Sequence, residues 1–212
     1  MNLFNKSVLA GALLTASASA FAATVDMTIS GTIKPPSCTP TLNNAGILDL
    51  GQIHGLSKTA TTALPAQQIT LSIVCSAPSS VGFQLVDNRS ASRMGGSHAY
   101  GLGLSNANPI GNYTLSVQSV NTMVDGAVGQ MMYKNGVTGT WLAHAPTADH
   151  GLNANTPTLF HALSTIGSTS PVPVTTMMIP IDVKPTINRS SLLDMTQAIP
   201  LDGSATIEVV YL

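Results

Sequence analysis

The chain has 212 residues, of which 44% are hydrophobic and only 8% are charged, with a formal net charge of −1 at pH 7. Nucleic-acid binding needs clustered lysine and arginine, so this composition excludes a nucleic-acid partner. The length favours one well-buried domain over two.

The N-terminus has the organisation of a secretory signal peptide. An apolar run over residues 8–14 follows a short basic start and precedes the small-x-small sequence Ala20-Phe21-Ala22. We predict cleavage between Ala22 and Ala23, followed by export. No later run approaches the roughly 18 apolar residues of a membrane-spanning helix, so we expect no transmembrane segment.

The mature chain, residues 23–212, shows apolar residues at every second position, which is typical of half-buried strands. Such alternation covers residues 25–33, 69–75, 81–85, 113–117, 172–183 and 205–211. A change of face at Pro180 indicates a bulge or an edge strand. In the last strand Ala205, Ile207, Val209 and Tyr211 share one face, and the chain stops one residue later.

No segment carries a sustained helical stripe, and the one plausible helical turn lies around residues 191–195. We therefore predict an all-β domain, a two-sheet sandwich in preference to a barrel, although the sequence leaves closure of the sheet open. Residues 88–112 and 144–170 are rich in Gly, Asn, Ser and Pro and are expected to form long surface loops.

Cys38 and Cys75 are the only cysteines. In an exported chain an even number of cysteines most simply forms disulfides, so we predict a bridge between them. It would close a loop of roughly 37 residues, which the chain-entropy model values at about 4 kcal/mol. A metal site on these cysteines would need a further Cys or His at ligand spacing, and none is near.

Candidate catalytic groups are few. A Ser105-His150-Asp149 arrangement needs Asp149 and His150 to converge, whereas adjacent residues on a strand point apart. His144, Asp149, His150 and His161 could hold a metal, but the spacing of the histidines matches no compact ligand motif, so we expect solvated loop histidines. No complete dinucleotide fingerprint occurs. We predict a protein that is not an enzyme, with no cofactor and no metal.

Trp141 is the only tryptophan. It is interpreted as partly buried core, with a stacking platform for a sugar as the alternative.

Six stretches together resemble a known family. They are "CTPTLNNAGILDLGQI" from Cys38, "LSIVCSAP" around Cys75, "DNR" from Asp87, "YGLG" from Tyr100, "IGNY" from Ile110, and the terminal "LDGSATIEVVYL". Their order and spacing resemble those of exported fimbrial-like proteins of Gram-negative bacteria that are grouped as a domain of unknown function. That family is similar to the pilin subunits of chaperone–usher systems.

The resemblance implies a pilin-like, incomplete immunoglobulin-like sandwich with a disulfide between its first two strands, matching Cys38 and Cys75. It implies adhesion or assembly by β-strand addition at the periplasm or cell surface, with a periplasmic chaperone, an usher and other fimbrial subunits as partners. The C-terminal strand that a chaperone grips would be represented by Ile207, Val209, Tyr211 and Leu212. The donor strand for the next subunit would be represented by Val25, Met27 and Ile29.

Two departures from the pilin pattern leave an alternative open. Pilins carry a glycine about fourteen residues from the end, where this chain has Ile199, and they have a longer free extension than the stretch from Ala23 to Cys38. The alternative function is a self-contained periplasmic or secreted β-sandwich that binds carbohydrate or protein through the two long loops around Trp141.

Overall fold

The computed structural model describes residues 25–153 and 158–212, so the predicted signal peptide and the bond between Ala22 and Ala23 lie outside the described residues. The chain divides into two compact units, residues 1–34 and 35–212. In the first unit, residues 25–34 have neither helix nor strand. The strand predicted over residues 25–33 is therefore wrong for this chain alone, because alternation produces a strand only where a neighbour supplies the backbone hydrogen bonds.

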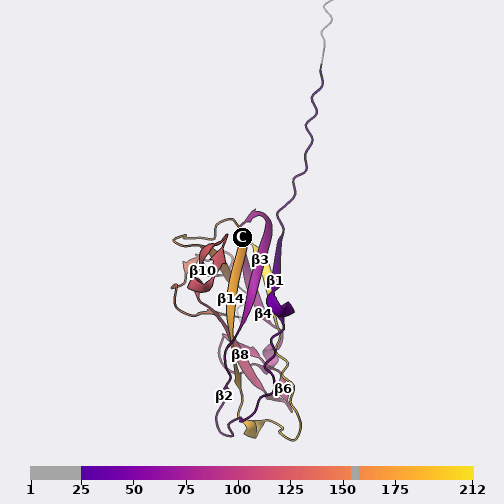
Figure 1. Ribbon diagram of the computed structural model, residues 1–212, viewed down its shortest axis with the longest axis vertical. Helices are drawn as coiled ribbons and strands as arrows, with labels where there is room; N and C mark the ends of the chain where they lie inside the picture. The colour runs from indigo at the N-terminus through magenta and orange to yellow at the C-terminus, as the bar shows by residue number, and fades with distance from the viewer. Residues whose placement is uncertain (1–24, 154–157) are drawn as a thin grey trace, which may run out of the picture. The chain divides into compact units, whose positions relative to one another are not determined.

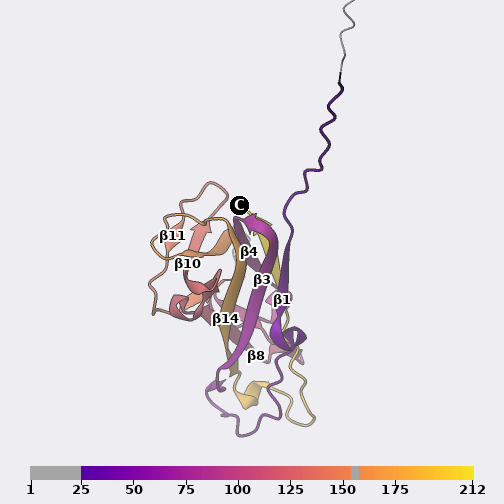
Figure 2. The same cartoon turned by 45° about the horizontal axis from the view of Figure 1, so that its top comes forward.

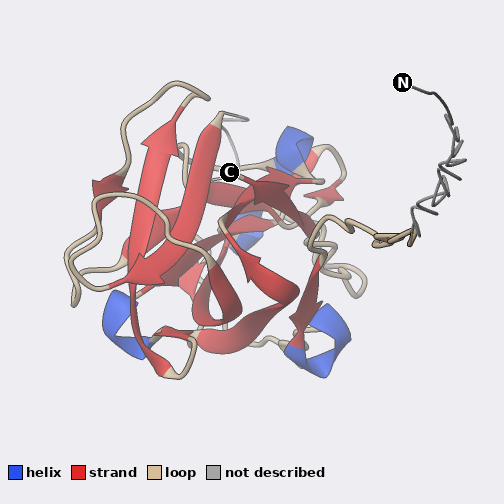
Figure 3. Ribbon diagram, turned by 90° about the horizontal axis from the view of Figure 1, so that it is seen from above, coloured by secondary structure: helices blue, strands red, loops and turns tan. Residues whose placement is uncertain are grey.

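The regular elements of the second unit are strands apart from four short 3₁₀ turns, which confirms the all-β prediction (Figure 3). Its strands are β1 (Cys38–Leu42), β2 (Thr62–Ala63), β3 (Gln67–Ser79), β4 (Val81–Asp87), β5 (Ala99–Gly101), β6 (Leu104–Ser105), β7 (Asn108–Pro109), β8 (Gly111–Val117), β9 (Met123–Val124), β10 (Ala127–Asn135), β11 (Leu142–Ala143), β12 (His150–Leu152), β13 (Leu159–Thr165), β14 (Val174–Ile187) and β15 (Ala205–Tyr211). Four 3₁₀ turns join them: η1 (Asn43–Gly46), η2 (Ser90–Ser92), η3 (Ser119–Asn121) and η4 (Ser190–Leu192).

The helical turn expected near residues 191–195 is the turn η4. The two predicted long loops, in contrast, contain short strands: β5 to β7 interrupt residues 88–112, and β12 and β13 interrupt residues 144–170. Among the described residues no helix is long and apolar enough to cross a bilayer.

Thirteen strands form one antiparallel sheet whose main path runs β1-β3-β14-β9-β10-β13-β4-β15. Figures 1 and 2 show β1, β3 and β14 side by side along this path. The sheet curls almost into a barrel, with β1 and β15 as the two ends of the path. Each of these two strands pairs with a single neighbour, β1 with β3 and β15 with β4.

The strand β14 pairs with four other strands of the sheet, β2, β3, β8 and β9. Its Met177–Met178 segment pairs with β9 and its segment 182–187 pairs with β8, while β3 lies along its other side. The irregularity falls between Val174 and Thr176, so the predicted bulge or edge at Pro180 is misplaced. Pro180 lies between the segments that pair with β9 and β8, where its missing N–H costs no ladder bond on that side.

The core follows the predicted alternation in β3, β4, β8 and β14. Its largest fully buried side chains include Leu71, Ile73, Phe83, Ile179 and Ile181, each at most 1% exposed. The register shift between Val174 and Thr176 places Met177 inward, at 3% exposed, and Met178 outward, at 39% exposed. These inward residues define the interior against which the candidate site opens.

Candidate functional site

The candidate site is the gap between the two end strands of the sheet, β1 and β15. The first wall, β1, is fixed covalently: Cys38 and Cys75 lie opposite each other in the β1–β3 pair and form a disulfide with an S–S distance of 2.04 Å. The predicted bridge is thus confirmed. It anchors the first residue of an end strand that is only five residues long.

The second wall is β15, which carries the residues predicted for partner contact. Ile207 and Val209 are half-buried and pack against the core, whereas Tyr211 and Leu212 are exposed. The Tyr211 hydroxyl accepts a hydrogen bond of 2.8 Å from the backbone N–H of Cys38. One end of the gap is therefore bridged by a side chain, while Ile207 lies farther along β15 toward the open part.

A large cavity opens between the walls. It has a volume of about 900 Å³, and its lining includes Leu42 of β1, Ile207 of β15, and Leu115 and Ile181 from the sheet interior. A smaller hollow of about 370 Å³ is lined by Pro40, Thr41, Leu42, Ala45, Leu71 and Ile207. Both hollows are lined largely by apolar side chains.

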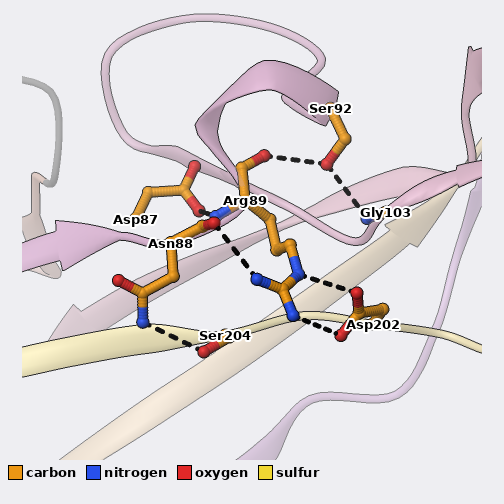
Figure 4. A network of polar contacts seen from close by, with 7 residues as sticks. All are labelled: Asp87, Asn88, Arg89, Ser92, Gly103, Asp202 and Ser204. Atoms are coloured by element: carbon orange, nitrogen blue, oxygen red, sulfur yellow. Dashed lines mark hydrogen bonds and ion pairs between the residues drawn. The ribbon is translucent and has the colours of Figure 1, made fainter.

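A network of polar contacts orients the segment that enters β15 (Figure 4). The Arg89 guanidinium binds both carboxylate oxygens of Asp202, with Nε–Oδ2 at 2.7 Å and Nη2–Oδ1 at 2.9 Å. Through its hydrogen bond and charge, Arg89 lowers the pKa of the Asp202 carboxyl. The Asn88 side-chain amide donates a hydrogen bond to the hydroxyl of Ser204, which lies two residues after Asp202. This contact region, residues 87–103 against 202–204, joins three of the stretches that carry the family resemblance, those that begin at Asp87, Tyr100 and Leu201.

The same network explains a glycine. Asp87 accepts hydrogen bonds from the backbone N–H groups of Arg89 and Gly101, and the Ser92 hydroxyl donates to the Arg89 carbonyl. A Cβ on Gly101 would lie 2.1 Å from that carbonyl oxygen, so only glycine permits this close packing.

The predicted donor residues Val25, Met27 and Ile29 lie in the first compact unit. Val25, Met27, Ile29 and Ile33 expose 93%, 80%, 84% and 99% of their surface. Four apolar side chains of one alternating pattern are thus in solvent, and a segment of this kind gains free energy if it is covered.

The histidines contradict the expectation of solvated loops. His150 and His161 are buried, and His150 Nε2 lies 2.9 Å from His161 Nδ1. Burial lowers the pKa of His150 to about 4 and that of His161 to about 3, so both rings are neutral near pH 7. Within residues 25–153 and 158–212, His161 Nε2 has no hydrogen-bond partner. The ring of His144 lies against His150 with centroids 4.5 Å apart.

This histidine cluster is not arranged as a metal centre: in residues 25–153 and 158–212 no three His, Cys, Asp or Glu side chains are placed as ligands. The Ser105-His150-Asp149 arrangement does not form either. The Asp149 carboxylate binds Lys184 and Gln118, the Ser105 hydroxyl accepts from the Asp194 backbone, and His150 faces His161.

Trp141 is half-buried, and the Lys134 ammonium lies 5.0 Å from its ring centroid. A cation already covers this ring, which leaves less of it free for stacking on a sugar.

Sequence reasoning missed most of the cavity lining, including Leu42 and the segments 46–56 and 193–201. These residues show no alternation that would have marked them. The cavity exists because segments distant in sequence, several of them outside regular structure, meet at the gap, and a single sequence carries no direct signal of that.

The fold and the gap define a class: a disulfide-bonded antiparallel β-domain whose sheet ends in two edge strands beside an apolar cavity. The model of the family described as "Protein of unknown function (DUF1120)" matches residues 27–135, just over half of the chain. The chain belongs to that family.

Two relatives from Escherichia coli K12 align along most of the chain. One is "Protein GltF", 26% identical over 88% of both chains, and the other is "Uncharacterized protein YhcF", 26% identical over 98% of both chains. Both alignments extend beyond the family match, toward the part of the chain that contains β14 and β15.

Proposed function

We propose that this protein is a non-enzymatic, fimbrial-like structural or adhesion subunit that acts by β-strand addition. The observation that carries the proposal is the apolar cavity of about 900 Å³ beside two edge strands. A protein that buries one more extended segment there completes its core and satisfies a free backbone edge at the same time.

Under this proposal the domain is an immunoglobulin-like sandwich of the pilin type that lacks one strand. Three features support it: the disulfide joins β1 to β3, the C-terminal strand β15 lies at an edge, and the interior opens between these two strands. The protein would be exported to the periplasm or cell surface of a Gram-negative bacterium. A periplasmic chaperone, an usher and other fimbrial subunits would be its partners.

The strand that fills the gap between subunits would come from a second copy of the chain. Residues 25–33 offer alternating apolar side chains, and the first β-strand begins only at Cys38. The free extension ahead of Cys38 is therefore not shortened by the strand that carries this cysteine. Residues 25–37 are all outside regular structure and could pair with a partner.

The self-contained β-sandwich is the second candidate, and one contact favours it. The hydrogen bond from Cys38 N–H to the Tyr211 hydroxyl already bridges the two edges, as expected if the chain completes its own fold.

The test is to produce the exported, disulfide-bonded chain without a matching chaperone and to measure its mass in solution and its thermal melting. Strand addition predicts chains of subunits or aggregates. Met27→Asp combined with Ile29→Asp should reduce them by placing carboxylates on the donor face. The matched control is Asp26→Asn combined with Ser30→Asp, which alters the alternate positions. A stable monomer with a single transition for the unmodified chain would refute the proposal and support the self-contained sandwich.

Capture by a chaperone gives an independent measurement. Removing Val209 to Leu212 should abolish co-purification with a periplasmic pilus chaperone, because β15 would lose half its free edge. Unchanged capture would count against the proposal.

A further inference from the structure

The two edges of the gap differ in the hydrogen bonds that they can offer. In an antiparallel pair, alternate residues direct their N–H and C=O groups to the partner, and the residues between them direct these groups outward. In β1 the hydrogen bond from Ser76 N–H to the Ser37 carbonyl sets this alternation. The backbone groups that point away from β3, toward the gap, are therefore those of Cys38, Pro40 and Leu42.

The β1 edge is almost devoid of donors. The N–H of Cys38 is already bound to the Tyr211 hydroxyl, and Pro40 has no N–H. Leu42 is left as the one residue of β1 that can donate toward the gap. Proline on the outward side of an edge strand is a known means of preventing strand addition.

The β15 edge has the opposite character. Hydrogen bonds from Asn88 N–H to the Ser204 carbonyl and from Leu212 N–H to the Ser80 carbonyl fix its alternation against β4. The outward groups consequently belong to Ala205, Ile207, Val209 and Tyr211, and none of these is proline. Ile207 and Val209 also place their side chains on the half-buried face. Backbone and side chains of β15 thus present a regular template for another strand.

We propose that the added strand pairs with β15 alone, while β1 forms a non-pairing wall that contacts it through side chains. The occupant is residues 25–33 of a second copy, chosen because their alternating apolar side chains match the apolar cavity and are otherwise exposed. This inference rests on the proposed function, since it specifies which edge receives the strand. The contact between Tyr211 and Cys38 marks the end of the paired stretch.

The decisive test uses the peptide of residues 23–34 and the full exported chain carrying Met27→Asp and Ile29→Asp, so that its own donor does not compete. The peptide is made in two N-methylated forms, one blocking the amides of Val25, Met27 and Ile29, the other those of Asp26, Thr28 and Ser30. Pairing with one edge predicts that one form loses at least about tenfold in affinity while the other binds like the unmodified peptide. Pairing with both edges makes both forms lose affinity equally, which would overturn the inference.

Substitutions on the two walls give the matching measurement. Val209→Pro removes an outward amide without removing a bond to β4, and we expect it to weaken peptide binding about tenfold or more. Pro40→Thr restores an outward amide on β1 and should leave the affinity within about twofold. Unchanged affinity in a Val209→Pro variant that melts like its parent would overturn the inference.

Amide exchange measured by NMR separates this inference from the function on which it rests. Bound peptide should slow exchange at Ile207 and Val209 and leave Leu42 unchanged. Protection of Leu42 equal to that of Val209 would overturn the one-edge pairing and keep strand addition. Absence of peptide binding to the folded chain would overturn both.

Discussion

The curled sheet has a closed side, where β4 pairs with β13, and an open side, at the gap between β1 and β15. The two sides differ in how completely the chain itself buries their side chains. On the closed side, β4 and β13 pair and bring Phe83 onto the ring of His161, and both residues are 0% exposed. On the open side, Leu42 and Ile207 face a cavity and remain half-buried. The comparison teaches that one sheet can be fully packed on one side and incompletely packed on the other; under the proposed function, the incompletely packed side is the one that receives a strand.

The largest contrast is expected from matched truncations on the two sides. Phe83→Ala should lower the free energy of unfolding by about 3–5 kcal/mol, because it leaves a cavity in a fully packed region. Ile207→Ala should cost only about 1 kcal/mol, since its side chain is already partly solvated, yet it should weaken strand capture. Urea unfolding and peptide titration measure the two effects. Equal destabilisation by both substitutions would contradict the distinction between the sides.

The disulfide provides the next largest effect. Cys38→Ser combined with Cys75→Ser should remove about 4 kcal/mol of stability by the chain-entropy model. Because the bridge holds β1, we also expect faster amide exchange in β1 than in β4. Thermal melting of the variant, compared with that of the reduced unmodified chain, checks the loss. A melting temperature unaffected by both treatments would show that β1 is held by other contacts.

Acidification should lower the free energy of unfolding through the buried histidines of the closed side. The pKa values of His150 and His161 lie at about 4 and about 3 in the fold, below the ordinary 6.5, because both rings are buried. Between these folded-state pKa values and pH 6.5, the unfolded chain therefore binds more protons than the folded chain. Stability is complete above pH 6.5 and falls as the pH drops toward 4, by on the order of 2 kcal/mol per ring at pH 5.

The measurement is the free energy of unfolding at pH 7.5 and pH 5. His161→Phe should reduce the difference, whereas His54→Gln at an exposed position should not. The rings of His98 and His144 also face the pair, and their charges lower the pKa of His150 further. A pH dependence that is unchanged in His161→Phe would assign the effect to other groups.

The smallest effect is expected at the contact between Arg89 and Asp202. Both side chains are substantially exposed, so Arg89→Ala should shift the melting temperature less than any change above. Its effect should be local, with faster exchange and proteolysis near Gly203, the residue next to Asp202 on the path into β15. Arg89→Lys is the control, because it keeps the charge and loses the two-pronged geometry. Protection near Gly203 that is unaltered by Arg89→Ala would show that the segment is held without this pair.

The sequence could predict much of the sheet, because residues such as Leu71, Phe83 and Ile181 repeat with the period of a strand and are buried accordingly. It misassigned residues 25–33 because the same pattern occurs in a segment that has no neighbouring strand. Short strands such as β12 (His150–Leu152) contain too few residues to show a period.

The site was predictable only in its parts. Cys38 and Tyr211 were both singled out, one for its disulfide and one for its place near the chain end. Their mutual hydrogen bond depends on the order of strands in the sheet, which a single sequence does not encode locally. The burial of His161 has the same origin, since Phe83 and His150 come from other strands.

The position of the disulfide also has a mechanical consequence. The bridge joins Cys38, the first residue of β1, to Cys75 within β3, and β3 is in register with β14 from Gln67 to Ser72 and beyond. A pull on the N-terminal segment would therefore reach β3 through a covalent bond without peeling β1 off residue by residue. The loop between the two cysteines, which contains β1 and β2, is not extended by such a pull while the disulfide is intact. In the oxidised form, tension along the backbone therefore bypasses residues 39–74.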